Sequence, residues 1–425
     1  MSTSVQKSGL PVLFINFILI LYPATVLFVP KMNGIIFALL AIAGLYSCVR
    51  VSEMSFKFNF DEKIFFQSIS IFFVVVLSIT LNAGFVYKAI GKYLHLILAI
   101  PIYMYLRHIG FRLAYFWYGL VLGSIIAAGV AMYDVWVIKS FRARSLTHPI
   151  IFGDLALIMG YMSLAGLGWF RKKSLWQTVL PIVALLCSVF ASVLAEARGS
   201  WLAVPFLFVV LFWYVRSLIS FKLKLGVALS VGVFFWGVYT IPQTEVGKHV
   251  DRAINNVKIY NNSEITSPNR SSSVGTRLEM WQASWTIFLN NPILGVGWGH
   301  YQEEAVLQIK QGLRNKSAAA HDHPHSQYFA ALANGGLLGI VVTIMLFLIP
   351  AWLFIKYIRL QKTEDSKRLA LAGLLLVVAY MIFCLSETLL ERSRSVNFFA
   401  FYLVVIMAAI NREQVCELSD GNGSL

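Results

Sequence analysis

Apolar residues occur along this chain in runs of about 20, separated by short polar stretches. A helix of that length crosses the hydrocarbon core of a bilayer. The first run lacks a small-x-small cleavage site and many runs follow, so we interpret it as a span and not as a removable signal peptide. The pattern predicts an all-α integral membrane protein with about twelve transmembrane helices, near residues 10–30, 33–51, 64–84, 94–107, 111–137, 149–170, 174–195, 200–220, 225–241, 328–355, 368–387 and 396–410.

The spacing of these runs divides the chain into four parts. Residues 1–241 hold spans 1–9, residues 242–327 form one large polar loop, residues 328–410 hold spans 10–12, and residues 411–425 form a tail. An even number of spans places both termini on one side. With the termini inside, the cytoplasmic loops carry sixteen Lys and Arg and the short outer loops carry nine. The positive-inside rule therefore predicts cytoplasmic termini and a large loop in the periplasm.

Composition agrees with a membrane protein. The chain is 58% hydrophobic and 13% charged, with a mean hydropathy of +0.71. The net charge of +15 would suggest nucleic acid for a soluble protein, but retained cytoplasmic loops account for most of it. We therefore expect contact with membrane lipids and none with nucleic acid. The cysteines form no disulfide framework and no CxxC zinc pattern; they are Cys48, Cys187, Cys384 and Cys416.

The large loop carries five of the eight histidines and is expected to be functional. Residues 276–279 fit a capping box that opens a helix, with Arg277 in its first turn and its end at Asn290-Asn291-Pro292. One side of this helix is apolar, which suits the membrane interface or packing on the bundle; it carries Leu278, Trp281, Trp285, Phe288 and Leu289. The glycine-rich segment 295–299 is expected to be mobile, and it lacks the strand–turn–helix context of a dinucleotide site.

Several cations are expected on the outer face, where positive charge is normally scarce. They are Arg198, Arg277, a group of Lys139, Arg142 and Arg144, and a pair of Arg392 and Arg394. The planar fork of arginine matches phosphate oxygens, so converging arginines would suit an anionic lipid head group such as a pyrophosphate. Snorkelling to the interface, or pairing with Glu196, Glu387 and Glu391, is the alternative.

The second candidate for chemistry is the segment His321-Asp322-His323-Pro324-His325, directly before the apolar run from Tyr328. His325 should lie near a helix N-terminus, where the dipole disfavours a protonated imidazole. A neutral histidine there could act as a general base toward a hydroxyl. Alternate histidines of an extended chain could instead bind a metal. The segment could also be only the start of a helix, or His321 and His323 could contact phosphate or lipid.

Four segments together resemble the O-antigen ligase and polymerase superfamily. They are Arg198-Gly199-Ser200-Trp201, residues 277–281 (RLEMW), residues 292–299 (PILGVGWG), and residues 323–329 (HPHSQYF) with 334–339 (NGGLLG). Their order and spacing agree with the family, as does a single large loop between late spans. The resemblance covers residues 190–345, and the rest of the chain only by topology. Ser326 stands where many members have Asn.

The resemblance implies an inner-membrane glycosyltransferase of the GT-C-like, all-helical kind, with its active site facing the periplasm. Such a ligase transfers O-antigen from undecaprenyl pyrophosphate to a sugar hydroxyl of lipid A–core, with inversion and with neither a metal nor another cofactor. His325 matches the family's essential histidine, and Arg198 and Arg277 match its two important arginines. As substrate contacts we add Lys139, Arg142, Arg144, His321, His323, Gln327, Tyr328, Arg392 and Arg394.

The sequence is also compatible with other functions. A polymerase of the same superfamily commonly has two substantial periplasmic loops, and a protein-directed O-oligosaccharyltransferase commonly has an added C-terminal periplasmic region. From a different class, a glycan flippase or secondary transporter would fit twelve spans, but internal repeats and polar groups near the midplane are its usual marks. A non-catalytic scaffold would leave the histidines and arginines unexplained.

Overall fold

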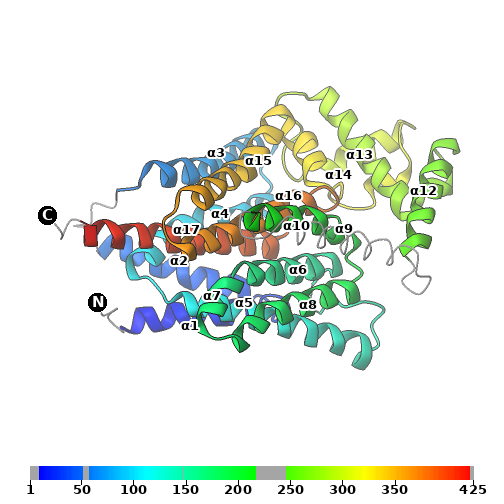
Figure 1. Cartoon of the computed structure of the whole chain (residues 1–425). Helices are drawn as coiled ribbons and strands as arrows, with labels where there is room; N and C mark the ends of the chain where they lie inside the picture. Colours follow the sequence, from blue (N-terminus) through cyan, green and yellow to red (C-terminus); the bar gives the residue numbers. More distant parts are fainter. Residues whose placement is uncertain (1–8, 51–56, 146, 217–245, 422–425) are drawn as a thin grey trace.

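The computed structural model describes residues 9–50, 57–145, 147–216 and 246–421, and every regular element within these ranges is helical (Figure 1). The α-helices before the large loop are α1 (Leu10–Thr25), α2 (Met32–Arg50), α3 (Phe60–Ala83), α4 (Tyr87–Ile109), α5 (Leu113–Met132), α6 (Pro149–Ala165), α7 (Leu167–Lys173), α8 (Val179–Leu194), α9 (Arg198–Trp201) and α10 (Ala203–Val215). The later ones are α12 (Val246–Asn262), α13 (Ser273–Asn290), α14 (Tyr301–Lys310), α15 (Gln327–Leu360), α16 (Glu364–Phe383) and α17 (Ser393–Gly421). Short turns are η1 (Tyr133–Val137, a π-helix), η2 (Trp176–Thr178), η4 (Pro268–Ser271), η5 (Lys316–Ala319) and η6 (Leu389–Glu391).

In these ranges nine helices are long and apolar enough to cross a membrane, or ten if α6 and α7, bent by 50°, count as one span. α1 is a shorter apolar helix. The prediction of an all-helical, multi-pass membrane protein is therefore confirmed. Each predicted span coincides with a helix except 225–241, which lies outside the described residues.

The helices of the bundle run between two ends. The start of α1 and the end of α17 lie at one end, and α12, α13 and α14 lie beyond the other (Figure 1). α16 and α17 are the most buried spans, whereas α10 lies at the periphery. Glycine permits close helix contacts, as in other membrane bundles: a Cβ on Gly119 would lie 2.1 Å from the carbonyl oxygen of Leu19, which brings α5 against α1.

The large loop has a core of its own around Glu279, which is fully buried on α13. Its carboxylate accepts hydrogen bonds from Arg270 Nη1 (2.8 Å), the Tyr260 hydroxyl (2.8 Å) and the backbone N–H of Asn315 (3.1 Å). A buried carboxylate needs such partners. Glu279 thus joins α12, η4, α13 and the segment before η5 into one unit.

The start of α13 differs from the prediction. The helix begins four residues earlier than the Thr276 cap would place it, with Ser272 as N-cap accepting from the backbone N–H of Gly275. Glu279 cannot complete a capping box because it is buried in the loop core. Arg277 therefore lies in the second turn. The predicted end at Asn290 is confirmed, and the side that carries Trp285 and Leu289 is exposed.

The glycine-rich segment that was expected to be mobile is anchored on α15. Val296 N–H donates to Ala333 O (3.0 Å) and Gly297 N–H donates to Asn334 O (2.9 Å). Trp298 is buried against Gly335, and α15 breaks at Gly336, where φ is +58°. A side chain at either glycine would clash. The glycines of the two motifs therefore permit contact between the loop and the first turns of α15.

Candidate functional site

The histidine segment lies between η5 and α15, as the sequence predicts. α15 begins at Gln327 with Ser326 as its N-cap, so His325 lies one residue before the cap. Its φ of +51° is unusual for a residue with a side chain. Such conformations cost about 1–3 kcal/mol and persist where surrounding contacts enforce them. Here the Gln327 N–H donates to Cys384 O (2.9 Å), which fastens the start of α15 to the end of α16.

Glu387, in the turn between α16 and η6, is the partner of this segment. It is 1% exposed, and its Oε2 lies 3.0 Å from His325 Nδ1. A carboxylate only accepts, so Nδ1 carries the proton and Nε2 is left as a proton acceptor. The sequence suggests Glu387 only as a possible ion-pair partner of an arginine. Its one distinguishing sign is its place in a short turn between two spans, beside the Arg392–Arg394 pair, and this does not identify it as the partner of His325.

His323 is held by three charged residues. Its Nδ1 lies 2.5 Å from Asp322 Oδ1, and its Nε2 lies 3.1 Å from Arg392 Nη2 and 3.4 Å from Glu387 Oε1. Arg392 can donate a hydrogen bond to His323 Nε2 only when that nitrogen carries no proton. Glu387 can accept a hydrogen bond from Nε2 only when it does carry one. Burial lowers the pKa of His323, but the hydrogen bonds to Asp322 and Glu387 outweigh burial and raise it to about 9. The protonated ring is thus favoured near neutral pH.

The pKa values of the ionisable groups next to His323 are shifted as well. The hydrogen bond from His323 holds the pKa of Asp322 below its usual range. Burial would raise the pKa of Glu387, but hydrogen bonds from His323 and His325 lower it below its ordinary value. Burial, together with the other two histidines, lowers the pKa of His321. The three imidazole rings lie with centroids 4.6–6.0 Å apart. The site therefore holds a carboxylate, Glu387, that stays charged among histidines.

Arg277 lies on the loop helix that covers these histidines. One turn along α13, Trp281 donates from Nε1 to Pro324 O (3.0 Å) and stacks on Phe329 with centroids 5.3 Å apart. Burial lowers the pKa of Arg277, and the charge of Glu387 opposes that shift. Arg277 is therefore close enough to Glu387 for their opposite charges to interact.

Arg198 opens the short helix α9, which packs against the end of α16. Gly199 lies so close to Ser386 that a Cβ would be 2.4 Å from its Oγ, and Ser386 precedes Glu387. Ser200 Oγ donates to Asp154 on α6. Arg198 Nη2 lies 3.3 Å from Glu196 Oε2. The structure thus brings the element that carries Arg198 to the turn that carries Glu387.

Other predicted substrate contacts have different surroundings. Gln327 Oε1 accepts from Leu390 N–H (3.0 Å), and the Tyr328 hydroxyl donates to Met381 O (2.8 Å). Arg394 Nη1 donates to Leu27 O at the end of α1 (3.1 Å), away from the histidines that Arg392 contacts. These three side chains fasten helices to one another.

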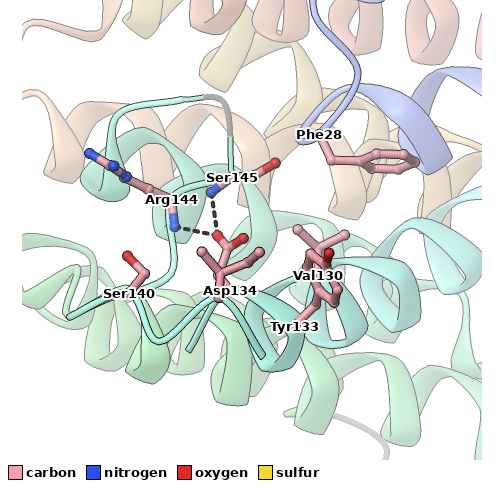
Figure 2. Close-up of a pocket in the computed structure, with 8 residues that line it drawn as sticks. Phe28, Val130, Tyr133, Asp134, Ser140, Arg144 and Ser145 are labelled. Carbon is pink, nitrogen blue, oxygen red and sulfur yellow. Dashed lines mark hydrogen bonds between the residues drawn. The ribbon is translucent and has the colours of Figure 1, made fainter. Parts of the chain in front are cut away.

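The remaining cations lie in the segment between η1 and α6. Lys139 and Arg144 are exposed, and Arg144 lines a pocket at the end of α1 and α5 (Figure 2). Desolvation lowers the pKa of His148, at the N-cap of α6, while Glu387 opposes the shift and Arg392, His325 and Arg142 add to it. His148 thus lies within electrostatic range of His325 and Glu387, and Arg142 lies within electrostatic range of His148.

Three of these residues could also hold a metal ion. Ligand atoms of His323, His325 and Glu387 all lie within 4.8 Å of one another. Imidazole and carboxylate suit several divalent ions. However, the guanidinium of Arg392 lies beside His323 Nε2, and a second cation there would be repelled. These three side chains are of types that bind metal ions, but the positive charge of Arg392 beside them opposes a bound cation.

Comparison with known proteins identifies similar chains. Residues 182–344 match a family model described as O-Antigen ligase. An uncharacterized protein of Haemophilus influenzae is 25% identical over 389 residues, which cover 91% of this chain and 96% of the relative. A ComP-specific O-oligosaccharyltransferase of Acinetobacter baylyi is 23% identical over 257 residues, which cover 59% of this chain and 41% of the relative. The matched family region includes α9, the large loop and the start of α15.

Proposed function

We propose that this chain is an O-antigen ligase, which transfers O-antigen polysaccharide from undecaprenyl pyrophosphate to a sugar hydroxyl of lipid A–core. The match of residues 182–344 to the family model supports the proposal. The observation that carries the proposal is the buried His325–Glu387 pair under a loop helix that bears Arg277. We place the protein in the bacterial inner membrane with this end of the bundle facing the periplasm. The positive-inside bias supports that orientation.

The reaction is one displacement at the anomeric carbon. The acceptor oxygen forms a bond to that carbon while the bond to the pyrophosphate oxygen breaks, which inverts the configuration. His325 Nε2 takes the proton of the attacking hydroxyl, and Glu387 stabilises the imidazolium through Nδ1. The electron pair leaves on the pyrophosphate, where Arg198 and Arg277 stabilise the new charge. His321, His323 and Arg392 contact substrate around His325.

Glu387 acts in this scheme as a positioning residue. Glu387→Gln is expected to lower kcat by about 10- to 100-fold, the range for losing a hydrogen bond to a charged group. It is also expected to move the acid limb of the pH–rate profile to lower pH, because the imidazolium of His325 loses its counter-charge. A purely structural role would leave that limb in place. Steady-state rates between pH 5 and 9 decide between these outcomes.

Metal removal gives a second test. Transfer is expected to be unchanged in excess chelator, because two guanidinium groups can neutralise the leaving pyrophosphate without a divalent ion. The check is the transfer rate before and after dialysis against chelator. Loss of activity that one specific divalent ion restores would instead assign His323, His325 and Glu387 to a metal site.

Reconstitution tests the function itself. The purified full chain is supplied with undecaprenyl-pyrophosphate-linked glycan and lipid A–core in liposomes, and the products are separated by size. Glycan on the core is the expected result. Elongation of the lipid-linked chain alone would indicate a polymerase. Because one relative is named an O-oligosaccharyltransferase, a protein acceptor is included in parallel, and glycan on that protein alone would indicate that activity.

A further inference from the structure

A second site lies near the histidine cluster but outside it. The pocket at the end of α1 and α5 has an apolar wall of Phe28, Val130, Tyr133 and Ile138 and a polar side of Asp134, Ser140, Arg144 and Ser145 (Figure 2). Asp134 stands on the π-helical turn η1, a type of turn that often marks functional sites. Lys139 and Ser145 have positive φ of 59° and 48° without being glycine. The segment is held in a conformation that costs energy.

The two oxygens of the Asp134 carboxylate have different surroundings. Oδ2 accepts from the backbone N–H groups of Arg144 (2.9 Å) and Ser145 (2.5 Å), which fixes the carboxylate. No residue in the described part of the chain donates to Oδ1, which points into the pocket (Figure 2). The Ser145 hydroxyl points toward Phe28, and the Arg144 guanidinium points away from the other lining side chains. The interior therefore offers acceptors beside an apolar wall.

This arrangement selects a class of ligand. A phosphate would be repelled by Asp134. A pyranose ring has hydroxyl donors on its rim, which suit a fixed carboxylate oxygen, and apolar C–H faces, which suit aromatic and aliphatic side chains. Hydroxyl-to-carboxylate bonds are among the stronger hydrogen bonds. The lining thus matches a neutral sugar better than an anionic head group.

The pocket is also close to the chemistry. Ser145 and His148 are three residues apart, so at most about 11 Å separates their Cα atoms. The charges of Glu387 and His325 act on the pKa of His148. A saccharide bound at His325 would reach the pocket by extending past His148.

We propose that this pocket, centred on Asp134, is a saccharide subsite that binds a sugar ring of the transferred glycan or of the acceptor core, away from the bond that reacts. The assignment of those two glycans rests on the proposed function. Binding energy from a remote sugar holds a long substrate in register for the reaction.

Two variants alter the pocket in different ways. In Asp134→Asn the amide oxygen can still accept from Arg144 and Ser145, while an NH₂ donor replaces Oδ1, so the loop is kept and the polarity in the pocket is reversed. Val130→Phe fills the pocket from its apolar side. Ile125→Phe, on an exposed part of the same helix outside the pocket, is the matched control.

Kinetics with substrates of different length test the proposal. Both pocket variants are expected to raise the KM of one substrate about tenfold, the effect of losing one good hydrogen bond, with kcat within twofold of wild type. The increase should vanish when that glycan is shortened. Loss of the effect with a one-repeat donor identifies the donor chain, and loss with a truncated core identifies the acceptor. The proposal would be overturned if KM increased equally at every glycan length or did not increase. It would also be overturned if the increase in KM depended on phosphatidylethanolamine in the nanodisc.

A direct binding measurement separates this proposal from the proposed function. Released O-antigen glycan and released core oligosaccharide, both without lipid, are added to the full chain in nanodiscs and followed by ligand-observed NMR. Binding that is lost in Asp134→Asn and Val130→Phe but kept in Ile125→Phe supports the subsite even if no transfer occurs. Transfer by the wild type with binding equal in all three variants overturns the subsite and leaves the proposed function standing.

Discussion

His325→Ala is expected to lower the rate of glycan transfer by about 10²- to 10⁴-fold, the usual contribution of a general base. The variant keeps the backbone contacts that hold the segment, because Gln327 N–H and the Ser326 side chain bond Cys384 O without the imidazole. The variant should therefore fold, with a thermal midpoint lowered only by the loss of one buried ring and its hydrogen bond to Glu387.

The matched control is His300→Ala, on the same loop. His300 contacts Glu303 and Gly84 O rather than Glu387, so its loss should leave the rate within a few fold of wild type. Rates are measured at saturating donor and acceptor in liposomes, with thermal unfolding followed in parallel. A His325→Ala protein that is folded and transfers glycan near the wild-type rate would rule out His325 as the base.

The membrane architecture follows from sequence because lipid imposes a simple rule. A backbone inside the bilayer must satisfy its own hydrogen bonds, so a long apolar run becomes a helix. The predicted runs outside 217–245 therefore coincide with helices. In the polar loop the helix start differs from the prediction, since Ser272 and not Thr276 caps α13 and the carboxylate of Glu279 accepts bonds inside the loop core instead.

The partner of His325 could not be read from the sequence. Glu387 is 62 residues away, in a turn that meets the histidines only because α15 and α16 pack side by side. For the same reason Gln327 and Tyr328 looked free to bind substrate, whereas their bonds to Leu390 and Met381 fasten helices. Residue type identified the histidine segment, and helix packing supplied its electrostatics.

Arg392 and Arg394 illustrate the same limit. They are two residues apart and the sequence gives no reason to separate them. Arg392 lies just before α17 with an extended backbone (φ −114°, ψ 109°), whereas Arg394 lies in the first turn of the helix. Arg392 contacts His323, and Arg394 donates to Leu27 O. Which member of a charged pair reaches the site therefore depends on where the helix begins.

The arginines give the other large effect. Arg277→Ala and Arg198→Ala are each expected to remove roughly 2–4 kcal/mol of transition-state stabilisation, about 30- to 1000-fold in kcat, because each guanidinium compensates charge that appears only as the pyrophosphate leaves. Arg277→Lys should recover part of the loss, since it keeps the charge but not the planar fork. The measurement is kcat with undecaprenyl-pyrophosphate-linked glycan at saturating acceptor.

Arg314→Ala is the control for Arg277, because Arg314 bonds Gln282 and Thr286 on the exposed side of the same helix. If Arg277→Ala slowed transfer no more than Arg314→Ala, Arg277 would only support the loop. The double variant Arg198→Ala/Arg277→Ala adds a sharper criterion. Two groups that share one pyrophosphate should give losses that are not additive, whereas groups at separate places should give losses that add within about 0.5 kcal/mol. Non-additivity would place both arginines on the leaving group.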